Sequence, residues 1–132
     1  MSIFYLTPLY GKYRRILAIS VIKKTWEIVE EAHPFLKGLK IRTLLSKRDE
    51  GGNATCVLVR CPIGAEIEEH VHEEQSDLVY VLEGEATMWV EEMGEFSIIP
   101  GTFIAVEKGK KHRTFDIKKD LLIYSVFVPP TF

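Results

Sequence analysis

The stretch Gly64–Gly84, GAEIEEHVHEEQSDLVYVLEG, holds two histidines one residue apart and an aspartate shortly after them. In a β-strand, side chains two positions apart point to the same face, so His70 and His72 are able to converge on one ion. Neutral imidazole suits Zn, Cu, Fe, Ni or Mn, particularly when a carboxylate completes the set. An isolated HxH pair is more often exposed or hydrogen-bonded than metal-bound, so the flanking residues decide what it indicates.

Further along the chain, the stretch Gly101–Asp116, GTFIAVEKGKKHRTFD, supplies a third histidine, His112. Together the two stretches resemble the two motifs of the cupin superfamily. The positions that match are the glycines and histidines: Gly64, His70, His72, Gly84, Gly101, Gly109 and His112. Three positions depart from the family pattern, with Asp77 in place of glutamate, Glu107 in place of proline and Asp116 in place of asparagine. The 16 residues between Gly84 and Gly101 resemble the short spacing of small, single-barrel members.

This resemblance implies an all-β fold, an antiparallel jelly-roll (double-stranded β-helix) barrel that binds a metal in its interior. Carried over by position, the implied ligands of one divalent transition metal ion (Fe, Mn, Ni, Cu or Zn) are His70, His72, Asp77 and His112. Asp77 is one methylene shorter than the usual glutamate, and capping a turn is the alternative role for it. Glu74 shares strand parity with the HxH pair and is the substitute carboxylate.

Strand alternation also predicts which other side chains face the site. Four are expected to point inward, where they would support the metal ligands or contact a substrate: Val79, Val81, Thr114 and Asp116. The valines make one wall apolar, which leaves a phosphorylated substrate without a clamp there. His33 lies outside both motifs and is expected to be a structural or surface histidine.

From Leu39 onward the chain consists of short segments rich in β-branched and aromatic residues, separated by glycine, proline or charge clusters. The predicted strands are Ile41–Ser46, Thr55–Cys61, Leu78–Leu82, Ala86–Glu91, Phe96–Ile99, Phe103–Val106, Arg113–Ile117 and Leu121–Val128. No helical pattern separates them, which favours a sandwich or barrel over a parallel sheet. Residues 39–132 are therefore expected to form the barrel.

Residues 1–38 are expected to form an extension that carries one helix, around Thr25–Ala32, with Pro34 after its end. The apolar run Ile16–Ile22 has no place inside so small a barrel. We expect it to cover a sheet edge, either of its own barrel or of a second subunit, so a homodimer is predicted.

Composition excludes several classes of partner. The formal net charge is −2 and the charged fraction 27%, so neither nucleic acid nor an anionic membrane surface is an expected partner. The run Ile16–Ile22 is far shorter than a transmembrane helix. The two cysteines, Cys56 and Cys61, form no CxxC pair and are expected to be free thiols in a reducing, cytoplasmic setting.

The resemblance leaves the reaction open, because cupins of this kind include dioxygenases, oxalate-degrading enzymes and sugar isomerases. One hypothesis is a metal-dependent enzyme of dioxygenase, oxidase or isomerase type that acts on a small molecule. The alternative is a non-catalytic module that binds or senses a small molecule, with a structural or ligand-anchoring metal. No general base other than Asp116 stands out in the sequence.

Overall fold

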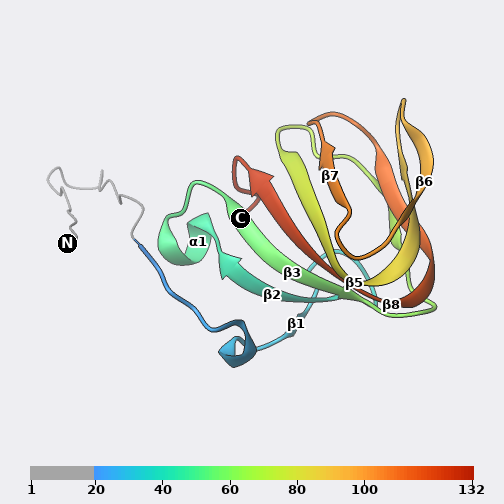
Figure 1. Cartoon of the computed structure of the whole chain (residues 1–132). Helices are drawn as coiled ribbons and strands as arrows, with labels where there is room; N and C mark the ends of the chain where they lie inside the picture. Colours follow the sequence, from blue (N-terminus) through green and yellow to red (C-terminus); the bar gives the residue numbers. More distant parts are fainter. Residues whose placement is uncertain (1–19) are drawn as a thin grey trace, which may run out of the picture.

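Antiparallel strands make up most of the computed structural model, which describes residues 20–132 (Figure 1). The elements, in chain order, are η1 (Thr25–Glu27), β1 (Glu31–Ala32), β2 (Lys40–Leu45), α1 (Lys47–Glu50), β3 (Thr55–Cys61), β4 (Ile67–His70), β5 (Ser76–Val90), β6 (Gly94–Ile98), β7 (Phe103–Val106) and β8 (His112–Val128). The strand order is β1-β2-β3-β8-β5-β6, with β4 paired to β8 and β7 paired to β5. The predicted all-β architecture is confirmed.

Two long, curved strands, β5 and β8, hold the barrel together (Figure 1). The first part of β5 pairs with β7, and its second part pairs with β6. The first part of β8 pairs with β4, and its second part pairs with β3. Each long strand is therefore paired along both of its parts, and the single sheet curves around a common interior.

The sequence divides each of these long strands into two shorter ones, and that division is wrong. Leu78–Leu82 and Ala86–Glu91 are parts of β5, and Arg113–Ile117 and Leu121–Val128 are parts of β8. Between the two parts of β5, Gly84 has a φ of +98° and the pairing with β8 shifts register. Bulges and a glycine allow a strand to bend while its pairing with the neighbouring strand continues. The glycine in the sequence therefore marks a bend in β5 and not the end of a strand.

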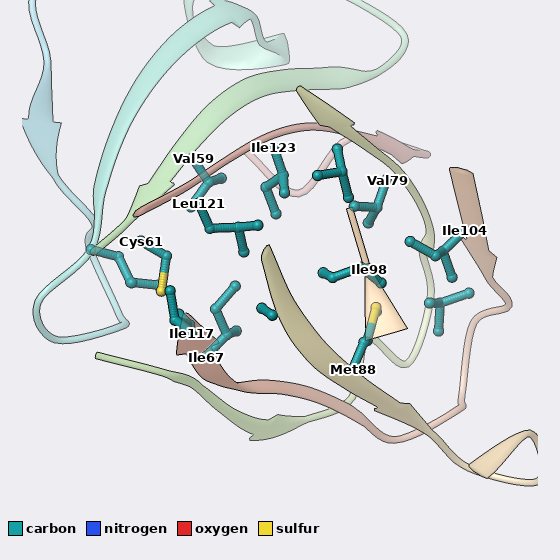
Figure 2. Packing of buried hydrophobic residues seen from close by; sticks show 14 of the residues in the cluster. Val59, Cys61, Ile67, Val79, Met88, Ile98, Ile104, Ile117, Leu121 and Ile123 are labelled. Carbon is teal, nitrogen blue, oxygen red and sulfur yellow. The ribbon is translucent and has the colours of Figure 1, made fainter. Parts of the chain in front are cut away.

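Alternation along the strands builds the core. In β3, every second residue is buried: Thr55, Val57, Val59 and Cys61. Figure 2 shows Val59 and Ile123 from one side of the barrel and Met88 and Ile98 from the other, all directed into the same interior. Several polar side chains are also buried, among them Asp77, His112 and Thr114.

The predicted helix at Thr25–Ala32 is wrong. Only the 3₁₀ turn η1 forms, and Ile28, directly after it, is already extended. Lys24 occupies the cap position without a side-chain hydrogen bond, and the β-branched Ile28 and Val29 disfavour further helix. The chain instead forms β1, an edge strand on β2. The apolar run Ile16–Ile22, which was predicted to cover a sheet edge, lies for the most part outside the described residues.

One strand near the motifs, β4, was missing from the prediction, because its residues Glu68 and Glu69 are charged and exposed.

Among residues 20–132, no helix has the length and apolar character needed to cross a bilayer.

Candidate metal centre

Pairing between β4 and β8 brings together two histidines that lie far apart in the chain. His70 is the last residue of β4, His112 is the first of β8, and the two are register partners. Their ring centroids are 4.2 Å apart. Both therefore reach the same point from neighbouring strands.

His72 reaches that point from a loop, not from the strand that the parity argument assumes. β4 ends at His70, and the backbone carbonyl of His72 accepts a hydrogen bond of 2.8 Å from the Gly109 N–H. Gly109 has a φ of +82° in the turn before β8. The two motif segments thus hold each other in place, and the ring of His72 lies 4.9 Å from that of His70 and 5.4 Å from that of His112.

One ring nitrogen from each of the three histidines lies within 4.8 Å of the other two, as in groups that hold a metal ion. Asp77, near the start of β5, is 6% exposed, and its Oδ2 lies 3.5 Å from Nε2 of His112. The structure therefore brings together all four residues that the motifs single out, with the carboxylate beside the imidazole cluster.

Hydrogen bonds fix which nitrogen carries the proton in two of the rings. Nδ1 of His70 lies 2.7 Å from the Glu68 carbonyl, and Nδ1 of His112 lies 3.0 Å from the Lys110 carbonyl. A carbonyl only accepts, so each Nδ1 is the protonated nitrogen and each Nε2 of the neutral ring carries a lone pair. Such second partners orient histidine ligands in metal sites.

Three buried atoms in this cluster make no hydrogen bond with the protein: Nε2 of His72, Nε2 of His112 and Oδ1 of Asp77. Buried polar atoms are rarely left without a partner, because each costs about 1–3 kcal/mol. Burial also lowers the pKa of His70 and His72, so these two rings disfavour a second proton. A metal cation satisfies all three atoms at once, and the residues present fit one.

The remaining sequence-predicted residues lie in three places: the cavity wall, the core and the exposed surface. Val79 and Thr114 line the cavity beside the histidines, whereas Val81 is fully buried in the core. Glu74 is exposed in the loop before β5, because His72 has left the strand and parity no longer applies. Asp116 is also exposed: its φ of +51° breaks the alternation of β8, so Ile117 is buried instead. The inward orientation predicted for Glu74 and Asp116 is wrong.

A cavity of about 250 Å³ opens directly over the cluster. Its wall is largely apolar, and its lining comprises His33, Phe35, Leu36, Val59, Ile67, His70, Val71, His72, Asp77, Val79, Met88, Ile98, His112, Thr114, Leu121, Ile123, Ser125 and Phe127. Sequence reasoning missed the contribution of His33, Phe35 and Leu36. These residues follow β1, and no periodicity in the sequence signals that this segment folds over the barrel.

Comparison with known proteins gives a match to one family model and to several solved structures. A family model described as "Cupin domain" matches residues 57–127, and no curated protein matches the chain. A predicted oxalate decarboxylase from Thermotoga maritima is 22% identical, with a TM-score of 0.72 over 83% of this chain and 99% of that one. Ectoine synthase from P. lautus is 24% identical, with a TM-score of 0.72 over 84% of this chain and 79% of that one.

KdgF from Halomonas sp. is 19% identical, with a TM-score of 0.68 over 80% of this chain and 92% of that one. Likeness at this level of identity shows a shared fold, and the predicted jelly-roll barrel is confirmed. The three names differ, so the fold alone does not select a reaction.

Proposed function

This chain belongs to the cupin domain family, and on that premise we propose that it holds one divalent transition metal ion with His70, His72, His112 and Asp77 and presents the ion to a small molecule. Iron, manganese, nickel, copper and zinc all suit three imidazoles and a carboxylate. At about 250 Å³, the cavity above the cluster is just below the roughly 300–1,000 Å³ of typical ligand pockets, so it suits a molecule at the small end of that range.

The observation that carries this proposal is the arrangement around His112. In the neutral ring, whose proton lies on Nδ1 and is donated to the Lys110 carbonyl, Nε2 faces the Asp77 carboxylate at 3.5 Å with a lone pair. Two electron-rich atoms at that distance in a buried site repel each other. A cation between the imidazoles and the carboxylate turns this repulsion into attraction.

The chain's own residues have distinct tasks in this proposal. A bound divalent ion would supply Lewis acidity, or redox chemistry, at an oxygen of the bound molecule. The carbonyls of Glu68 and Lys110 hold the rings of His70 and His112 in one orientation. Val79, Phe127 and the other apolar side chains exclude water from the reacting group.

The catalytic form of this function is a metal-dependent enzyme of dioxygenase, oxidase or isomerase type. One observation favours the alternative, a non-catalytic binding or sensing module. Asp116, the candidate general base from the sequence, is exposed. In the described cavity wall, the only titratable side chains are the four ligand candidates and His33, so no other carboxylate is in place to act as a base. Oxygen uptake by the iron-loaded protein across a panel of small acids and ketones, lost in His70→Ala, supports the enzyme; loading without turnover supports the module.

Elemental analysis of the purified protein tests the metal site itself. We expect about one equivalent of metal in the wild type and clearly less in His70→Ala and His112→Ala, because each substitution removes one of the four proposed ligands. Asp77→Asn should bind the ion about 10–100-fold more weakly.

His33→Ala is the matched control, because it removes an imidazole from the same cavity without touching the cluster; it should retain full metal content. Equal metal content in wild type and His112→Ala would refute the site.

A further inference from the structure

His33 lies outside both motif segments, yet it lines the same cavity as the three clustered histidines. Its position is fixed by the segment around it. Glu30 Oε2 lies 3.1 Å from Arg42 Nη1 and 3.1 Å from Arg60 Nε, which ties the chain to the outside of β2 and β3. The N–H of His33 then donates to the Leu39 carbonyl at 2.9 Å, closing the turn after β1.

The hydrogen bonds of the His33 ring determine its tautomer. Its Nδ1 accepts from the backbone N–H groups of Phe35 at 3.1 Å and Leu36 at 3.0 Å. An acceptor nitrogen carries no proton, so the proton of the neutral ring lies on Nε2. Over residues 20–132, no protein acceptor takes this Nε2–H, which leaves it available as a donor to a ligand.

The cavity selects for a particular kind of molecule. Its lining contains no lysine or arginine among the described residues, and Val79, Met88, Ile98 and Phe127 make its deeper wall apolar. With a divalent ion and the Asp77 carboxylate, the site has a net charge of +1. In an apolar cavity, a single negative charge balances it best, whereas a phosphate or dicarboxylate leaves charge uncompensated.

We propose that His33 positions the bound molecule, and that this molecule is a small monocarboxylic acid with an apolar body. The Nε2–H of His33 donates a hydrogen bond to a carboxylate oxygen, and the apolar body packs against Val79, Met88 and Phe127. This inference rests on the proposed function, because the metal supplies the charge that the carboxylate balances. Arg42 and Arg60 take no part, since both are paired with Glu30 on the outside of the sheet.

Calorimetric titration of the zinc-loaded protein with benzoate tests the proposal. The variant is His33→Asn, whose amide oxygen accepts the same two backbone N–H groups and whose amide nitrogen stops short of the Nε2 position. We expect unchanged zinc content and about tenfold weaker benzoate binding, because a charge-assisted hydrogen bond is lost. Lys37→Ala, on the same turn but exposed, is the matched control and should bind benzoate as the wild type does.

Benzyl alcohol, which keeps the apolar body and lacks the charge, should bind at least tenfold more weakly than benzoate. Long-range ¹H–¹⁵N spectra of the metal-free protein provide an independent readout, in which His33 should show a protonated Nε2. Benzoate binding equal in His33→Asn and wild type, or absent from the zinc-loaded wild type, overturns this inference while leaving the metal site standing. Failure of the wild type to take up zinc, measured beforehand by elemental analysis, overturns both.

Discussion

Cys61 shows how one buried side chain makes the stability of this barrel depend on pH. It is fully buried at the end of β3, and burial raises the pKa of its thiol from 9.0 to about 12. Below pH 9 the thiol is protonated in both the folded and unfolded chains. Between pH 9 and 12 only the unfolded chain loses the proton, so the free energy of unfolding should fall by about 1.4 kcal/mol per pH unit.

Urea unfolding of wild type and Cys61→Ala at pH 8 and pH 10.5 measures the contribution of thiol ionisation to the free energy of unfolding. The cavity left by the substitution lowers that free energy by the same amount at both pH values, so it cancels. The stability advantage of the wild type should shrink by about 2 kcal/mol at pH 10.5. An advantage of equal size at both pH values would contradict the assignment.

Single residues also mark where sequence reasoning succeeds and where it stops. The spacing of the motifs identifies His70, His72 and His112, because resemblance depends only on order along the chain. It does not give the tautomers, which depend on the carbonyls of Glu68 and Lys110 in the folded chain. The orientation of Asp116 was mispredicted because one residue with positive φ reverses the alternation of a strand.

Among the elements, the bend of β5 is the feature that lets one strand pair with β6, β7 and β8 around the barrel. A methyl group at Gly84 would lie 2.3 Å from the Asp120 carbonyl oxygen and 2.6 Å from the Leu121 Cα, both in β8. Gly84→Ala should therefore destabilise the fold by about 2–4 kcal/mol, through backbone strain and a clash that β8 cannot relieve without moving.

Gly94→Ala is the matched control. Gly94 has a φ of +86° and open space around the added methyl, so only backbone strain of about 1–2 kcal/mol applies. Urea unfolding measures both variants. Equal losses in the two would show that close packing at the bend is unimportant.

The strands themselves were largely predictable, for a physical reason. β3 and β7 match their predicted bounds, because alternating β-branched residues between turns specify a half-buried strand locally. The continuity of β5 and β8 was not predictable, because it depends on pairing with strands distant in the chain. The charged strand β4 was missed for the same reason: its place in the sheet comes from β8 and not from its own composition.

In the whole molecule, the described part of the segment before the barrel contributes both to the sheet, through β1, and to the cavity wall, through His33. Residues 1–38 were predicted to be an extension that covers a sheet edge; within its described part, β1 pairs with β2 and His33 lines the cavity. Ile22, Trp26, Val29 and Phe35 in this segment remain exposed. A homodimer formed through it stays a prediction, which light scattering of the full chain tests directly. The cytoplasmic setting likewise stays a prediction.

The central claim is that three imidazoles from β4, β8 and the loop between β4 and β5 share one metal ion beside Asp77. An anomalous difference map from crystals of the metal-loaded protein, recorded at the absorption edge of the bound metal, tests it most directly. We expect one peak about 2.0–2.3 Å from a nitrogen of each of His70, His72 and His112. A peak elsewhere on the protein, or none within the cluster, would contradict it.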